Sequence, residues 1–106
     1  MARGMTEHTK LPDDCTSMKE VREGVDATDR ALMALIARRY GYMRAAARIK
    51  PSRDVVRDED RKAEVIANAR ADAEKRGLPA DDLAAIWDSL VESSIRYELK
   101  EWDRTR

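Results

Sequence analysis

The chain has 106 residues, the size of one domain, and its 21 Lys and Arg balance 21 Asp and Glu, so it lacks the basic excess typical of nucleic-acid-binding proteins. A single cysteine and a single histidine exclude an internal disulfide and give no support to a zinc site or a histidine-based triad, and we predict neither a metal nor another cofactor. The N-terminus lacks an apolar signal sequence and no stretch approaches about 18 apolar residues, so we expect a cytoplasmic protein with no membrane partner.

The beginning of the chain differs in character from the remainder. Residues 1–16 are polar and aperiodic, and we predict that they form a flexible leader to a helical domain at residues 17–106. Ser17 and Glu20, three positions apart, are typical of a capping box that opens a helix. The first helix is therefore predicted to begin at Met18.

This first helix is predicted to extend to Lys50. Apolar residues recur every three or four positions along it, and Pro51 ends it because the residue before a proline avoids helical geometry. Gly24 and Gly41 weaken the helix without breaking it. Its length of about 48 Å exceeds what one compact domain of about 100 residues covers. We therefore predict a homodimer with the long helices side by side; the alternative is a kink at Gly41 that folds the monomer back on itself.

Two shorter helices are predicted to follow. Asp58 is the expected N-cap of the second, which continues to Arg76, and Gly77 is the glycine expected just after its end. Pro79 suits the first helical position of the third, which continues to Trp102. No segment alternates with a period of two, so no sheet is expected. The predicted fold class is all-α, with three helices per chain in a homodimeric bundle.

Two cations of the first helix occupy a face that should be apolar. Arg39 and Lys50 are eleven residues apart and so point in nearly the same direction. Long cations are rarely buried unless they are paired, so this placement indicates a pocket for an anion. Alternatively both extend to solvent or pair with acids of a neighbouring helix. The residues around Arg39 are those we most expect to be buried: Leu35, Ile36, Tyr42 and Met43.

The third helix carries a similar anomaly. Ser94 and Glu98 continue its apolar stripe, which otherwise consists of Leu83, Trp87 and Leu90. Taken alone, Ser94 could bond to its own helix and Glu98 could pair with an outside cation. Together with the inward-facing cations they predict a binding site inside the bundle. The loop that would close one end of this site contains Arg57, Asp58 and Arg61.

The chain contains the three stretches VREGVDATDRALMALIARRYGYMRAAARIK, VRDEDR and SSIRYELK. Together they resemble the all-helical chorismate mutases of the AroQ type. The resemblance extends from about residue 17 to about residue 102. It implies an intertwined homodimer in which each long helix contributes to both active sites. The implied reaction is the Claisen rearrangement of chorismate, a cyclic dicarboxylate, to prephenate in aromatic amino acid biosynthesis. The resemblance depends on the combined spacing of six residues: Arg22, Arg39, Lys50, Asp58, Arg61 and Ser94.

The resemblance also implies a role for each matched residue. Arg39 of one protomer and Arg22 of the other would bind substrate carboxylates. Arg61 would add positive charge near these carboxylates, and Ser94 would form a hydrogen bond to one of them. The backbone at Asp58 would contact the ring hydroxyl.

At the breaking bond, Lys50 would donate to the ether oxygen. Glu98 stands where a glutamine usually assists this lysine, although some family members carry glutamate there. Lys62 stands where a glutamate usually accepts from the substrate hydroxyl.

The departure at Lys62 is one reason to keep an alternative. The isochorismate pyruvate lyases, a sister group with this fold, also lack that acidic residue and share a leader like DCT and an ending like EWDRTR. The alternative activity is therefore the cleavage of isochorismate to salicylate and pyruvate. Ser94 and the VRD before Glu59 match the mutases better. A non-catalytic helical dimer is a lesser alternative.

Overall fold

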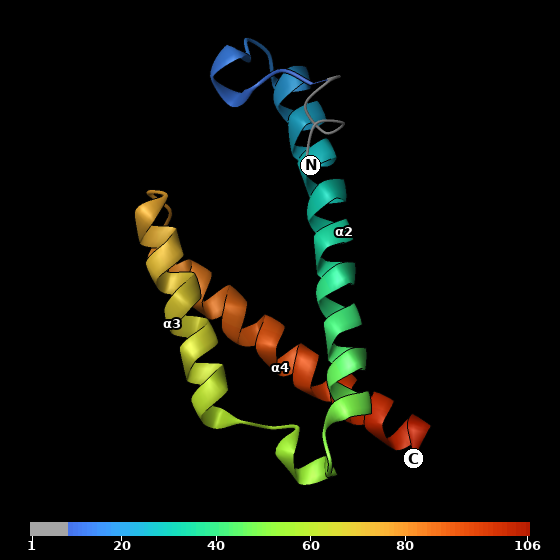
Figure 1. Ribbon diagram of the computed structural model, residues 1–106. Coiled ribbons are helices and arrows are strands. Elements are labelled where there is room, and N and C mark those ends of the chain that lie inside the picture. The colour runs from blue at the N-terminus through green and yellow to red at the C-terminus, as the bar shows by residue number, and fades with distance from the viewer. Residues whose placement is uncertain (1–8) are drawn as a thin grey trace. The chain divides into compact units, whose positions relative to one another are not determined.

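The computed structural model describes residues 9–106, so residues 1–8 of the predicted leader lie outside the described part. In that part the chain forms three α-helices and two short 3-10 helices, without a strand. The helices are α2 (Met18–Ile49), α3 (Glu59–Lys75) and α4 (Ala80–Thr105), and the 3-10 helices are η1 (Pro12–Asp14) and η2 (Arg53–Val55) (Figure 1). The prediction of an all-α chain with one long and two shorter helices is confirmed. Among residues 9–106 no helix is both long and apolar enough to cross a membrane.

The chain divides into two compact units, Met1–Arg39 and Tyr40–Arg106. Within the first unit, the start of α2 forms part of the predicted capping box. Ser17 Oγ accepts from the Glu20 backbone N–H at 3.2 Å. The Glu20 carboxylate, however, accepts from the N–H of Thr16 at 2.8 Å and pairs with Lys10 at 2.8 Å. These contacts lower the pKa of Glu20 to about 2, with Lys10 as the largest cause.

In the second unit the helix ends follow from local side-chain chemistry. Asp58 caps α3, because its Oδ1 accepts from the Arg61 N–H at 3.0 Å, as predicted. Gly77 follows α3 with φ of 70°, in the left-handed region that glycine adopts without strain, also as predicted. The prediction for Pro79 was wrong by one position. Pro79 is the N-cap of α4, with extended backbone, and its carbonyl accepts from Leu83 N–H at 3.0 Å.

The core of the second unit is small. α3 and α4 pack together as an antiparallel hairpin (Figure 1). The buried cluster consists of Val56, Val91 and Ile95, with Val65 and Leu99 packed against it. No described side chain in the protein is both large and fully buried. A core of this size contributes little hydrophobic stabilisation to a chain of about 100 residues.

The expected burial around Arg39 is wrong in part for a single chain. Leu35 is 61% exposed and Tyr42 is 59% exposed, whereas Ile36 and Met43 are partly buried, so the prediction fails for two of its four residues. Leu32 and Ile49, further along α2 in each direction, are exposed as well. An amphipathic pattern identifies the apolar face of a helix but not the chain that covers it. The exposed apolar face of this long helix is therefore available to a partner chain.

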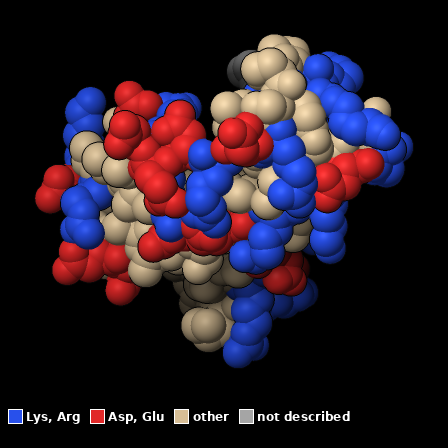
Figure 2. All heavy atoms as spheres, turned by 90° about the horizontal axis from the view of Figure 1, so that it is seen from below, with Lys and Arg blue, Asp and Glu red and all other residues tan. Residues whose placement is uncertain are grey.

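Charge on the surface is arranged in local pairs. On the face shown in Figure 2, basic and acidic side chains lie next to one another. Within the α3–α4 hairpin, Arg76 pairs with Asp72 at 3.0 Å, and Arg70 pairs with Asp81. Exposed pairs of this kind contribute little to stability, so they do not compensate for the small core.

Candidate active site

An ion pair joins the end of α2 to α4 in the second unit. Lys50 follows the last residue of α2, and its Nζ lies 2.8 Å from Oε2 of Glu98. The Glu98 side chain is only 5% exposed, whereas that of Lys50 is 28% exposed. Lys50 Nζ also donates to the carbonyl of Val56 at 3.3 Å. The ammonium group is therefore held at a fixed position beside a buried carboxyl group.

The Glu98 carboxyl group has unused hydrogen-bonding capacity. Its Oε2 is buried and makes no hydrogen bond within residues 9–106, although the Lys50 ammonium lies at ion-pair distance. The distance from Lys50 Nζ to Glu98 Oε2 is thus short enough for a hydrogen bond, but the angles between the two groups do not fit one. Leaving a buried acceptor unsatisfied is costly, and such groups are often functional. A carboxylate only accepts hydrogen bonds, whereas a carboxylic acid or an amide at the same position can also donate.

Ser94 lies one turn before Glu98 on α4, and each of the two residues is 3% exposed. The Ser94 hydroxyl donates to the Leu90 carbonyl at 2.7 Å, which is the bond to its own helix considered as an alternative. A hydroxyl has a single proton to donate, so Ser94 would have to exchange the Leu90 carbonyl for a ligand carboxylate in order to bind it. The two polar residues predicted to face the interior from α4 are therefore both buried there.

Asp58 and Arg61, at the start of α3, are not directed at the Lys50–Glu98 pair. The Asp58 carboxylate is used as the helix cap, which leaves its backbone as the part that could meet a ligand. The Arg61 guanidinium pairs with Glu64 along α3 at 2.5 Å, and its side chain is 63% exposed. An exposed pair within one helix is weak, so Arg61 can exchange this partner for an anion at low cost.

Lys62 is bound into an ion-pair network with α4. Its Nζ lies 2.7 Å from Glu92 Oε2 and 3.1 Å from Asp88 Oδ1. Glu92 also accepts two hydrogen bonds from the Arg57 guanidinium, at 2.7 and 3.0 Å. Lys62 therefore connects α3 to α4 and is not directed toward Lys50.

Glu92 and Asp88 are the members of this network that sequence reasoning missed. A signal was present, because Asp88 and Glu92 are four residues apart and so share one face of α4, opposite two cations. The Arg57 guanidinium, and after it Lys62, lower the pKa of Glu92 to about 2. Glu92 therefore joins the loop before α3, the start of α3 and α4 through one carboxylate.

We expect the Glu92 network to be sensitive to acid. A carboxyl group whose pKa is lowered on folding stabilises the fold above its unfolded value and loses that contribution as pH falls through the folded value. For Glu92 this window runs from the ordinary 4.5 down to about 2. Urea unfolding at several pH values should therefore show a smaller loss of stability in this window for Glu92→Gln than for wild type. The control is Glu64→Gln, which removes an exposed pair within α3. Equal pH slopes for wild type and Glu92→Gln would contradict the role given to Glu92.

The two arginines expected to bind carboxylates belong to the first unit. Arg22 is exposed on α2, and Arg39 is partly buried near the end of that unit. Lys50 and Glu98 belong to the second unit. The joint participation of these four residues in one site stays a prediction.

The second unit thus presents a fixed cation and a buried carboxyl group with a serine one turn away. A fixed cation stabilises negative charge that develops on an oxygen during a reaction. The site residues offer no serine or cysteine paired with a base, and a reaction that needs no covalent intermediate suits them best.

Comparison with known proteins agrees with this chemistry. Residues 21–99 match the family model for chorismate mutase type II, and this range includes every predicted site residue. The chain is similar to the isochorismate pyruvate lyase of Pseudomonas aeruginosa, with 30% identity over 97 residues. That similarity covers 92% of this chain and 96% of the relative. The chain therefore belongs to the chorismate mutase type II, or AroQ, family.

Proposed function

We propose that the protein is a chorismate mutase that converts chorismate to prephenate in aromatic amino acid biosynthesis. The observation that carries the ether-bond chemistry of this proposal is the Lys50 ammonium held 2.8 Å from the buried Glu98 carboxyl group, and Ser94 with the VRD before Glu59 favours the mutase over the lyase. In the rearrangement, the ether bond breaks and negative charge develops on its oxygen. A donor already fixed at that position stabilises the transition state more than the ground state.

The remaining residues would act by binding the substrate in its reactive shape. Arg39 of one protomer and Arg22 of its partner would each bind a carboxylate, with Ser94 as a further hydrogen-bonding group. Holding the dianion in its diaxial conformation brings the two reacting carbons together and removes much of the entropic barrier. Arg61 would add positive charge after leaving its exposed partner Glu64.

Isochorismate pyruvate lyase activity is the second candidate. It is favoured by the similarity to the Pseudomonas aeruginosa isochorismate pyruvate lyase, which this chain matches over nearly its whole length. Lys62 is compatible with this activity, because the lyases also lack an acidic residue at this position. Lys62 binds Glu92 and Asp88, and as a lysine it cannot accept a hydrogen bond from a substrate hydroxyl. Both reactions break an ether bond to the enolpyruvyl group, so the Lys50–Glu98 pair suits either of them.

One assay separates the candidates. Purified protein is incubated in parallel with chorismate and with isochorismate, while prephenate, salicylate and pyruvate are quantified separately. Our proposal predicts prephenate from chorismate at a higher kcat/KM than salicylate from isochorismate. The reverse ranking would assign the protein to the lyases. Absence of both products, together with no binding of either dicarboxylate, would identify a non-catalytic helical dimer.

We also propose that residues 17–106 form an intertwined homodimer with two shared sites. The support is the small core of Val56, Val91 and Ile95, together with exposed apolar residues along α2. A second copy would bury these side chains, each worth about 1.5–3 kcal/mol when fully removed from water. Sedimentation at micromolar concentration should then report roughly twice the 12.1 kDa chain mass. A stable and fully active monomer would contradict the dimer and the shared site together.

A further inference from the structure

We propose that Arg106, stacked on Trp102, is a positioning residue for Lys50, an inference that rests on the proposed function. Arg106 follows α4, and its Nη2 donates to the carbonyls of Ala47 and Lys50 at 3.1 and 3.2 Å. These carbonyls belong to the backbone that carries the Lys50 side chain. Arg106 therefore acts on the catalytic ammonium through the main chain and has no contact with the reacting atoms.

The need for this contact arises from Pro51. The last carbonyls of an α-helix lack backbone donors four residues further on unless the chain continues the helix. The Ala46 carbonyl is satisfied, because the Lys50 N–H donates to it at 2.9 Å. The equivalent donor for the Ala47 carbonyl would be residue 51, which is a proline and has no N–H. Ala47 is only 1% exposed, so solvent is a poor substitute. Arg106 supplies the donor that Pro51 cannot.

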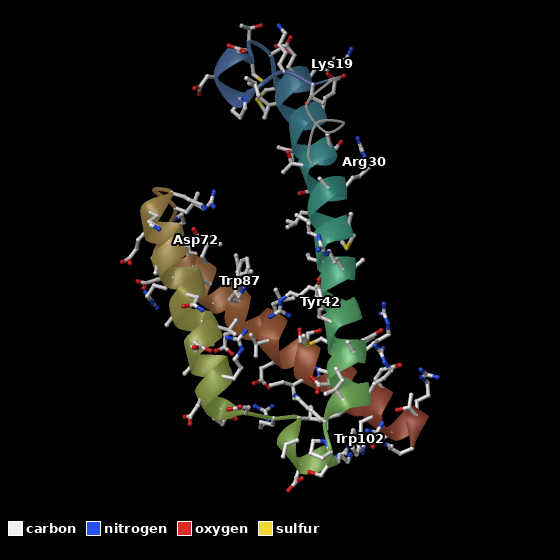
Figure 3. All side chains as sticks on the ribbon, viewed as in Figure 1. Lys19, Arg30, Tyr42, Asp72, Trp87 and Trp102 are labelled. Atoms are coloured by element: carbon white, nitrogen blue, oxygen red, sulfur yellow. The ribbon has the colours of Figure 1, made fainter. Side chains whose placement is uncertain are left out.

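The guanidinium group of Arg106 is itself held in place. Its Cζ lies 3.5 Å from the ring centroid of Trp102, a cation–π contact on the last turn of α4. Trp102 is labelled in Figure 3, beside the end of α2. A planar guanidinium on an aromatic face keeps several donors available in a fixed orientation, which a lysine ammonium would not do. The stacking therefore orients Arg106 toward the two carbonyls.

A second contact from the same turn of α4 reaches the chain just after Lys50. Arg53, in η2, donates to both carboxylate oxygens of Asp103, at 2.8 and 3.1 Å. Both side chains are 55% exposed, so the pair adds little stability. Its effect is geometric, because Arg106 contacts the backbone before Pro51 and Asp103 contacts the Arg53 side chain after it.

The end of α4 therefore contacts Lys50 at two points, its ammonium group and its backbone carbonyl. Glu98 contacts the ammonium group, and Arg106, eight residues further along the chain and about 12 Å along the helix axis, contacts the backbone carbonyl. Positioning matters here because a displacement of about 1 Å can cost about 100-fold in rate. Further back along α2, Tyr40 and Arg44 also contact α4 through Ser93 and Tyr97, but within residues 9–106 Arg106 is the group of the α4 end that reaches the Lys50 carbonyl itself.

The kinetic test compares Arg106→Ala with Arg104→Ala. Arg104 lies two residues earlier and pairs with Glu101 on its own helix. Arg104→Ala therefore also removes one exposed arginine and serves as the matched control. We expect Arg106→Ala to lower kcat for chorismate about 10- to 100-fold with KM within about twofold, because the carboxylate-binding arginines remain. Arg106→Lys, which retains a cationic donor but not the planar guanidinium, should recover part of kcat. Arg104→Ala should match wild type. A raised KM with unchanged kcat, or equal effects of the two alanine variants, would overturn the proposal.

A second measurement does not depend on catalysis. Hydrogen exchange of the Lys50 and Val56 backbone N–H groups reports on the two turns that Arg106 and Asp103 contact. We expect exchange at both positions to be faster in Arg106→Ala than in wild type, with Arg104→Ala unchanged. Equal exchange in Arg106→Ala and wild type would overturn the proposal, even if the protein is a mutase. Faster exchange in a protein that acts on neither dicarboxylate would instead refute the proposed function and leave the backbone contact established.

Discussion

Lys50→Met is expected to lower kcat/KM for chorismate by about 10²–10³-fold, the usual cost of removing one preorganised donor from a developing oxyanion. Methionine keeps the length and most of the volume of lysine but cannot donate a hydrogen bond. The loss should appear in kcat more than in KM, because the interaction strengthens as the ether bond breaks. Steady-state assays of prephenate formation measure both constants.

This variant also tests stability, because it leaves Glu98 buried without a cation. Removing one partner of a buried pair costs about 3–5 kcal/mol, and we expect the lower end because Lys50 is 28% exposed. The double variant Lys50→Met/Glu98→Gln removes the buried charge and should regain most of the lost stability without regaining activity. A Lys50→Met protein with nearly wild-type kcat/KM and a normal fold would exclude Lys50 from the chemistry.

Arg39→Ala is expected to lose activity by a similar or larger factor. Truncating one side of a buried charge pair costs about 2–5 kcal/mol, which corresponds to about 30- to 5,000-fold. Arg22→Ala should also be damaging, although Arg22 is exposed in the single chain. The matched control is Arg30→Ala, another exposed arginine of α2, labelled in Figure 3. Its activity should stay close to wild type.

Subunit exchange then tests whether Arg22 acts across the interface. In a heterodimer of Arg22→Ala and Arg39→Ala chains, one site has both arginines and the other has neither. A randomised equal mixture should therefore recover about one quarter of wild-type activity, because half the dimers are mixed and each has one intact site. Verified heterodimers without recovered activity would show that both arginines act from the same protomer or that neither binds substrate.

The elements of this fold were predictable where the determinants are local. Asp58 as the cap of α3 and Gly77 after its end depend on chemistry within a few residues, and the structure confirms both. Pro51 correctly marks the end of α2 to within one residue. Pro79 was misplaced by one position because proline is compatible both with the cap and with the first turn.

The site was predictable only in part. Helical periodicity indicated that Lys50 and Glu98 face the interior, and they meet there. The contacts of Glu92 with Arg57 and of Arg106 with Lys50 join residues 35 and 56 positions apart, so no local pattern encodes them. Whether Leu35 is buried depends on a second chain, which a single amphipathic stripe does not specify.

The most direct test of the account is the pH dependence of Glu98. To assist Lys50 at the ether oxygen, Glu98 must donate a hydrogen bond, and only its protonated form can do so. The account predicts that kcat/KM of the wild-type protein for chorismate declines as pH rises. Glu98→Gln donates at every pH and should retain activity near neutrality with a flattened profile. A flat wild-type profile that Glu98→Gln leaves unchanged would contradict the account and reduce Glu98 to an ion-pair partner of Lys50.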